Sequence, residues 1–285
     1  MNSKIRLESK RLLTHCAPRL FIISFLSFLL RYSLMVIYVW GVALLYGSTF
    51  FSTLLKAYNE YIVYGISVLL LSITAFFCLL FISGIRLGEG SAYFTRANGG
   101  TGSLFTLFRY LKPSRCMKAL SLYLKISGLK FLWLIYFFTP AVICAGCIYY
   151  LYRSDYIAQS VYIVLSVGLS IILAFAVIMS RVMSLRLSAA PYYMCLQNSI
   201  TTSKAIKKSI RFTDGFLCDG VVLEYSLTGW LLSCIFIIPA FYVIPYTKLT
   251  KAVFITEALF SREASKEPYA INYICLSKAK AEPTM

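Results

Sequence analysis

Histidine and acidic residues are scarce in this 285-residue chain. It holds one histidine, His15, and 11 acidic residues against 28 basic ones, so its formal net charge is +17. A single histidine excludes a metal site built on several imidazoles. Because His15 lies in the basic N-terminal arm, it also excludes a histidine-activated nucleophile within the apolar segments. We therefore predict no catalytic residue, no metal site and no cofactor, and we expect that the protein is not an enzyme.

Carboxylates in apolar sequence are also too poorly placed for paired-acid chemistry. Asp219 and Glu224 stand in one apolar segment and are five residues apart. A mechanism with two catalytic carboxylates needs both to face one substrate, whereas this spacing directs them to different faces of a helix. This pair gives no support to an enzymatic function.

Charged residues of either sign are fewer in this chain than in a typical soluble protein. Charged residues make up 14% of the chain and hydrophobic ones 59%, with a mean hydropathy of +0.75. Soluble domains average about 25% charged and roughly 45–50% apolar residues, so a single water-soluble core is excluded. Nucleic-acid binding is not expected, because the basic residues are spread over several connections rather than gathered on one folded domain.

Nine cysteines do not indicate a disulfide framework here. Most lie in or beside apolar segments, where a free cysteine behaves as a small hydrophobic residue. We expect reduced thiols. The alternative for Cys144 and Cys147, which have the spacing of a redox pair, is disfavoured because they lie inside an expected membrane span.

Six long apolar segments predict an all-α, polytopic helical membrane bundle. About 20 apolar residues in a helix cross a hydrocarbon core of about 30 Å. The expected spans are residues 20–46, 61–83, 131–151, 156–180, 216–238 and 239–260, within one membrane domain of residues 20–261. Residues 1–19 form a basic arm and 262–285 a polar tail. The first apolar run is far longer than the core of a signal peptide, so we expect an uncleaved span.

The basic residues predict the orientation in the plasma membrane. The connection over residues 84–130 holds eight Lys and Arg against the single acid Glu89, and residues 181–211 hold six and no acid. Lys and Arg are retained in cytoplasmic loops, so we place the N-terminus and both connections in the cytoplasm. The number of membrane spans near the C-terminal end of the sequence is open. Two final spans return the tail to the cytoplasm, whereas a single span over 226–244 would leave it outside; we favour six spans.

A basic amphipathic helix that ends at about Thr213 is predicted in the linker, with Ser199, Thr201 or Thr202 as its N-cap. At 100° per residue Ile206, Ile210 and Thr213 lie opposite one basic arc. The arc consists of Lys204, Lys207, Lys208 and Arg211. We expect it to face anionic lipid headgroups. The alternative is a solvated helix packed against neighbouring spans. A second surface helix is expected after Ser103.

A candidate intramembrane charge cluster comprises Arg31, Glu224, Lys248 and Lys251. With six spans, Arg31, Glu224 and Lys251 lie roughly 12–16 Å from a cytoplasmic helix end. Charges in a low-dielectric interior persist mainly when they are compensated, so we predict that Glu224 pairs with Lys251 or Arg31. Such a pair either fixes the register of the helices or belongs to a transport site.

Four short motifs carry a resemblance to a known family. They are Ala189-Ala190-Pro191-Tyr192-Tyr193, Ala205 and Ser209 before Gly215, Ser226-Leu227-Thr228-Gly229-Trp230, and Pro245-Tyr246 with Thr250 and Ala252. Over its second half the chain resembles bacterial integral membrane proteins of the domain-of-unknown-function 975 family. The resemblance implies a multi-pass helical membrane protein and brings no established activity.

We therefore expect a non-enzymatic accessory or scaffold component of the plasma membrane. Its basic loops would meet anionic lipid headgroups of the bilayer or a membrane-protein partner. The alternative is a permease, or a subunit of one, that uses the charged residues within its spans.

Overall fold

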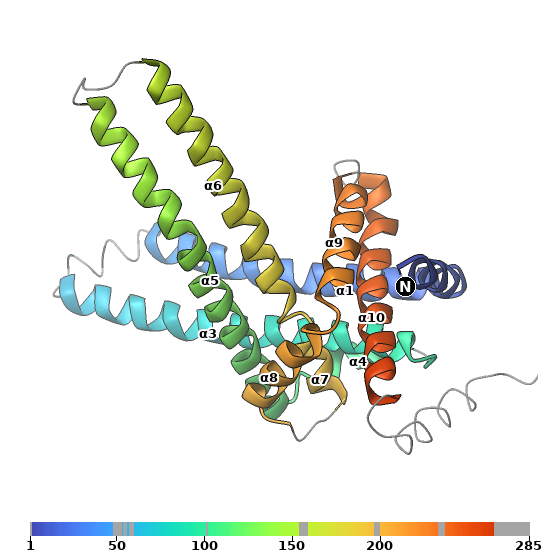
Figure 1. Cartoon of the computed structure of the whole chain (residues 1–285). Coiled ribbons are helices and arrows are strands. Elements are labelled where there is room, and N and C mark those ends of the chain that lie inside the picture. The colour runs from blue at the N-terminus through green and yellow to red at the C-terminus, as the bar shows by residue number, and fades with distance from the viewer. Residues whose placement is uncertain are drawn as a thin grey trace, which may run out of the picture. The chain divides into compact units, whose positions relative to one another are not determined.

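The computed structural model describes residues 2–47, 53, 56, 60–100, 102–153, 159–196, 200–232 and 237–264, and these residues contain helices, turns and short links but no strand. This confirms the predicted all-α class. The helices are α1 (Asn2–Gly47), α3 (Glu60–Ala97), α4 (Phe105–Phe108), α5 (Pro113–Arg153), α6 (Gln159–Leu185), α7 (Ala190–Leu196), α8 (Thr202–Thr213), α9 (Leu217–Leu232) and α10 (Ile237–Ala264) (Figure 1).

The residues expected to form one membrane domain fall into two compact units. The first comprises Met1–Ser121 with Tyr225–Met285, and the second comprises Leu122–Glu224. The first unit is thus discontinuous in sequence: it is built from the beginning and the end of the chain.

Four helical segments are long and apolar enough to cross a membrane. They are Pro18–Gly47, Tyr61–Ala97, Pro113–Leu151 and Ile163–Leu196. No more than 22% of the most apolar stretch of each is buried, so most of their apolar side chains face outward. Outward-facing apolar surface on this scale is typical of helices in lipid. The four helices agree with the prediction of a multi-pass membrane protein.

The expected count of six spans is not confirmed. Residues 216–238 and 239–260 are absent from the four candidates in the described part of the chain. The described α9 has only 16 residues, and α10 carries Lys248, Lys251 and Glu257. Most of α10 from Val243 to Leu259 is buried against protein. A helix whose surroundings are protein need not be apolar on every side, which explains why α10 tolerates charges and threonines.

Several helices extend beyond their predicted ends. The basic arm is the first part of α1, and residues 84–97, expected in a loop, continue α3. Helix α5 begins at Pro113 rather than near residue 131. The extension of α1 is amphipathic: Ile5, Ser9 and Leu13 are fully buried among its basic residues. Protein contacts along one face stabilise these extensions, and apolar content alone does not reveal such contacts.

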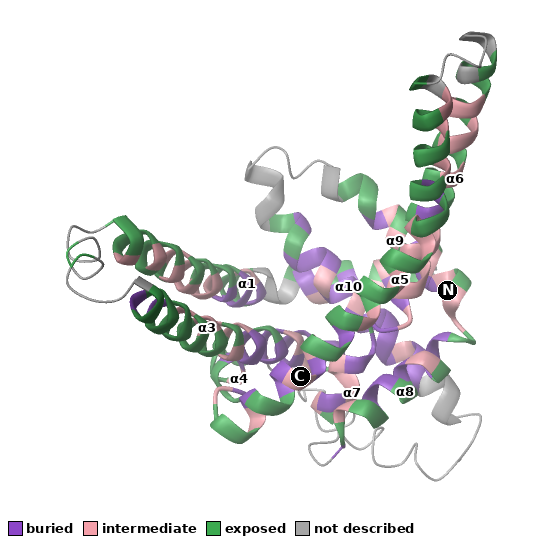
Figure 2. Ribbon diagram, turned by 90° about the vertical axis from the view of Figure 1, so that its left-hand side faces the viewer, coloured by how far each residue is buried: buried purple, intermediate pink, exposed green. Residues whose placement is uncertain are grey.

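In the first unit α1 and α3 are antiparallel neighbours. Tyr93 donates a 3.2 Å hydrogen bond to the carbonyl of Leu20, and the Cys78 thiol lies 3.9 Å from the carbonyl of Leu34. All described buried residues of α1 lie before Arg31, and α3 is mostly exposed near Glu60 but mostly buried from Ser83 to Ala97, so the two helices bury residues at the same end (Figure 2). The core there includes Ile23, Ile85, Ala92 and Leu107. Helix α10 runs across both helices at this buried end (Figure 1).

The second unit has its own core, where α5, α7 and α8 meet. It consists of Leu122, Ile126, Leu187, Ala190, Met194, Ile200, Ala205 and Ile206. Helix α8 ends at Thr213, as predicted, and Thr201, one of the three N-cap candidates, is in extended conformation at its N-cap. The other expected surface helix, after Ser103, belongs to the first unit and is only the single turn of α4. There the Ser103 hydroxyl accepts a 3.2 Å hydrogen bond from the Phe105 amide.

Candidate functional site

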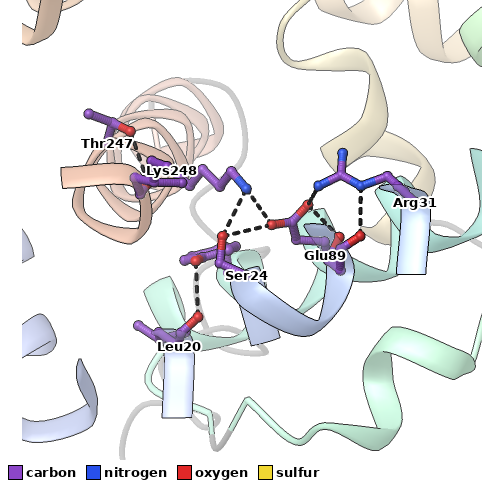
Figure 3. Close-up of polar contacts among 9 residues, drawn as sticks. Leu20, Ser24, Arg31, Glu89, Thr247 and Lys248 are labelled. Carbon is purple, nitrogen blue, oxygen red and sulfur yellow. Dashed lines mark hydrogen bonds and ion pairs between the residues drawn. The ribbon is translucent and has the colours of Figure 1, made fainter. Parts of the chain in front are cut away.

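A buried carboxylate, Glu89, lies at the meeting point of α1, α3 and α10. Its Oε2 accepts hydrogen bonds from Ser27 Oγ at 2.9 Å and from Arg31 Nη2 at 3.1 Å. Its Oε1 accepts one from Ser24 Oγ at 3.2 Å and another from the ammonium of Lys248. Glu89 is only 5% exposed. Four donors from two neighbouring helices therefore satisfy both of its oxygens (Figure 3).

The donors around Glu89 are themselves held in place. Lys248 Nζ also donates to Ser24 Oγ at 3.0 Å, and Arg31 Nε donates to the carbonyl of Ser27 at 2.9 Å. On α1 the three contributing side chains follow at spacings of three and four residues, which places them on one face of the helix. We call Ser24, Ser27, Arg31, Glu89 and Lys248 the Glu89 cluster.

The Glu89 cluster has more positive than negative charge. One carboxylate forms ion pairs with two cations, Arg31 and Lys248, so the formal sum is +1. The side chain of Glu89 is 7% exposed, whereas those of Arg31 and Lys248 are 22% and 35% exposed. The negative charge thus lies inside the unit, and both positive charges reach its surface.

The cluster lies near one end of the apolar part of α1. At 1.5 Å per residue, Arg31 is about 22 Å and Ser24 about 33 Å from Tyr46, near the other end of the helix. A hydrocarbon core of about 30 Å that begins at Tyr46 would therefore end between these two residues. In that placement, the cluster lies at the level where hydrocarbon meets the headgroups on the side of the N-terminus.

Two of the four predicted cluster residues, Arg31 and Lys248, contact the same carboxylate, Glu89. Their acidic partner differs from the prediction: Arg31 forms its ion pair with Glu89 rather than Glu224. Glu224 is half-buried on α9, and Lys251 is half-buried on α10. A pairing of Glu224 with Lys251 stays a prediction.

Sequence reasoning missed Glu89, Ser24 and Ser27. Glu89 stands between Gly88 and Gly90 among basic residues, which led to its assignment to a loop. A useful signal was present in α1, because Ser24, Ser27 and Arg31 form a polar stripe within an apolar run. A polar stripe on an apolar helix indicates a partner on a neighbouring helix.

The basic arc of α8 is exposed, as predicted. Lys204, Lys207, Lys208 and Arg211 all face outward. On the opposite side Ala205 and Ile206 lie in the core of the second unit. The apolar face of α8 therefore packs against protein, which corresponds to the alternative weighed for it. Contact between its cations and lipid headgroups remains a prediction.

Further polar contacts fix α8 within the second unit. Lys125 donates 3.0 Å hydrogen bonds to the hydroxyls of Thr202 and Ser203 at the start of the helix. Near its end Ser209 donates a 2.6 Å hydrogen bond to the carbonyl of Arg186. An ion pair of 3.4 Å joins Arg186 to Asp214. The orientation of the basic arc is thus determined at both ends of the helix.

An apolar hollow of about 790 Å³ lies between α5 and α6. Its lining includes Tyr136, Phe137, Pro140, Cys144 and Phe175. These side chains offer mainly hydrophobic contact, and none of them is a carboxylate, a histidine or a basic group. Pro140 lies within α5.

Cys78, Cys116, Cys144, Cys147 and Cys218 are free thiols in the described part of the chain. His15 lies on α1, in the part that was predicted to be a basic arm. Among the described residues no group of three or more His, Cys, Asp or Glu could hold a metal ion.

The chain was compared with known proteins through family models, curated sequences and solved structures. None of the three comparisons finds a match.

Proposed function

We propose that the protein is a non-enzymatic scaffold or accessory component of the plasma membrane. The observation that supports this function best is the bonding of Glu89. Its two oxygens are engaged by four donors of the same chain, and these bonds join the first, second and last long helices of one unit. A carboxylate that is saturated in this way holds helices together, whereas a transport or catalytic acid must exchange partners during its cycle.

The proposal includes a topology. Helices α1, α3, α5 and α6 cross the membrane, and α9 and α10 add a fifth and a sixth membrane segment that enter and leave on the cytoplasmic side. Exposed apolar side chains on these two helices, among them Val222, Trp230 and Tyr242, support membrane insertion. Both termini then lie in the cytoplasm, in keeping with the basic residues of the tail. The resemblance to the domain-of-unknown-function 975 family is part of this proposal.

Cysteine labelling of intact cells tests the topology. A cysteine at Ser277, in a background without native cysteines, should resist an impermeant thiol reagent in intact cells and react after lysis. Native Cys234, kept as the sole cysteine between α9 and α10, reports whether this pair reaches the outer surface. Labelling of Ser277→Cys from outside would contradict the topology.

A scaffold should have a specific neighbour in the membrane. We expect a photoreactive amino acid at exposed Leu69 on α3 or Tyr136 on α5 to give a discrete crosslinked protein band in cells. The same substitution at buried Leu122 is the matched control and should give none. The scaffold proposal fails if the exposed positions give only lipid adducts while the purified protein carries a solute across liposome membranes.

The second candidate is a permease for an anionic solute. The formal charge of +1 in the Glu89 cluster favours it, because a surplus cation beside apolar spans attracts anions. Liposome flux that is abolished by Lys248→Gln, in a protein that still folds, would favour the permease. No flux at all would favour the scaffold, whereas flux that Lys248→Gln leaves unchanged would exclude the Glu89 cluster as the transport site.

A further inference from the structure

The bonding of the Glu89 cluster leaves hydrogen-bond donors unused. Arg31 has five N–H groups and Lys248 has three. Two from each make the bonds described above, and no bond to a described residue engages the others. Neither side chain has a buried nitrogen that lacks a partner in the described part of the chain. The side chains of Arg31 and Lys248 are 22% and 35% exposed, so another molecule can reach them.

These donors lie on both sides of one carboxylate. Figure 3 shows the Arg31 guanidinium and the Lys248 ammonium flanking Glu89, with one terminal nitrogen of Arg31 directed away from the carboxylate. Two cations that project beyond a shared acid form a fork for an anion with more than one oxygen. A phosphate group suits such a fork, since guanidinium binds its oxygens with two donors and ammonium adds a point charge.

We propose that Arg31 and Lys248 bind the phosphate group of an anionic phospholipid in the cytoplasmic leaflet. This inference rests on the membrane placement under the proposed function, which puts the cluster at headgroup level. The phosphodiester of a phospholipid carries one negative charge, which balances the formal +1 of the cluster. Exposed Phe25 and Phe28 on α1 lie next to the cluster and would contact the acyl chains. Inorganic phosphate shares the same chemistry, and the experiment separates the two sources.

The test uses the purified full chain in neutral detergent. Thermal unfolding is followed while short-chain phosphatidylglycerol, short-chain diacylglycerol or inorganic phosphate is added. A ligand that binds only the folded protein raises Tm with its concentration. We expect phosphatidylglycerol to raise Tm with saturation at one lipid per chain and diacylglycerol to have no such effect. A Tm that responds equally to the two lipids would overturn the proposal.

Variants test whether Arg31 and Lys248 determine the affinity for phosphatidylglycerol. Lys248→Gln and Arg31→Gln should each weaken the apparent affinity for phosphatidylglycerol about tenfold, as expected when one charged hydrogen bond is lost. Lys10→Gln, which removes an exposed cation of α1 outside the cluster, should leave the affinity unchanged. Equal affinity in the wild type and both cluster variants would overturn the proposal. If Lys248→Gln does not fold, Lys248→Arg should retain binding, and the comparison of the two lipids on the wild type still decides.

The experiment also separates lipid binding at the Glu89 cluster from binding of free phosphate, from binding at α8 and from a failure of the proposed topology. Stabilisation by inorganic phosphate at the affinity of phosphatidylglycerol would support a phosphate site but assign it to the soluble ion, which would overturn the lipid assignment. Replacing the four α8 cations by Gln should not change this one-site titration, because they lie in the other unit. A failure of the proposed topology appears in the labelling of Ser277→Cys, whereas a failure of this inference appears in the titration.

Discussion

Lys248 on α10 donates a 3.0 Å hydrogen bond to Ser24 on α1, although 224 residues separate them in the sequence. The same ammonium contacts Glu89 on α3. One lysine thus connects the last described helix to the first two. Because Lys248 contacts residues of two other helices, its replacement should affect the whole first unit.

Replacing Glu89 by Gln should destabilise the protein by roughly 2–4 kcal/mol, because it leaves two cations near one another without their acid. Thermal or denaturant unfolding in detergent measures the loss. Glu8→Gln, on the same unit but outside the cluster, is the control and should change stability by less than about 0.5 kcal/mol. If the two variants are equally stable, Glu89 does not hold the helices together.

Charge removal at Arg31 should be coupled to that at Glu89. In a double-mutant cycle, Arg31→Gln combined with Glu89→Gln should destabilise less than the sum of the two single changes, with an interaction energy of about 0.5–3 kcal/mol. Arg31 Nη2 and Glu89 Oε2 are 3.1 Å apart, and residues in direct contact are those for which such coupling is measured. Strict additivity would show that their ion pair contributes nothing to folding.

Gly88 should not tolerate alanine. A Cβ at this position would collide with the Leu107 carbonyl and lie 3.0 Å from Leu107 Cα, so α4 would have to move away from α3. We expect Gly88→Ala to cost about 1–3 kcal/mol, the usual range for overpacking. Gly90→Ala is a close control, because nothing lies within 4 Å of its added Cβ. That control should be neutral or stabilising by up to about 1 kcal/mol through higher helix propensity.

Ile206 on α8 should be far more sensitive than its neighbour Lys207. Ile206 lies in the core of the second unit, and Lys207 is exposed. Ile206→Ala should therefore lower the free energy of unfolding by about 2–5 kcal/mol, whereas Lys207→Ala should change it by about 0.5 kcal/mol or less. Unfolding curves of the two variants provide the comparison. A smaller loss for Ile206→Ala than for Lys207→Ala would contradict the buried face of α8.

Local pattern was enough to predict some elements. The existence of α8, its end near Thr213 and the exposure of its basic arc follow from local pattern and 3.6-residue periodicity, which need no knowledge of other helices. The long apolar helices were equally evident. The need for a partner of Arg31 was also correctly inferred, because an arginine in an apolar helix requires compensation.

The identity of that partner depends on information that is not local. Glu89 lies between two glycines that lower helix propensity, so the end of the apolar run suggested a loop. Gly88 is required there for a different reason: its lack of a Cβ lets the Leu107 backbone approach α3. The burial of α10 was equally hidden, since its charges are compatible with a protein interior only when its neighbours are known.

The discontinuous first unit has a consequence for biogenesis. Once α1 and α3 have been synthesised, Arg31 and Glu89 are both present, and the ion pair that they form in the complete structure would lower the cost of placing the two helices in the membrane together. The hydrogen bonds of Lys248 with Ser24 and Glu89 cannot form until the whole second unit, Leu122–Glu224, has been translated. Assembly of the unit is therefore completed only near the end of synthesis, and a chain that ends before α10 lacks the contact that closes it.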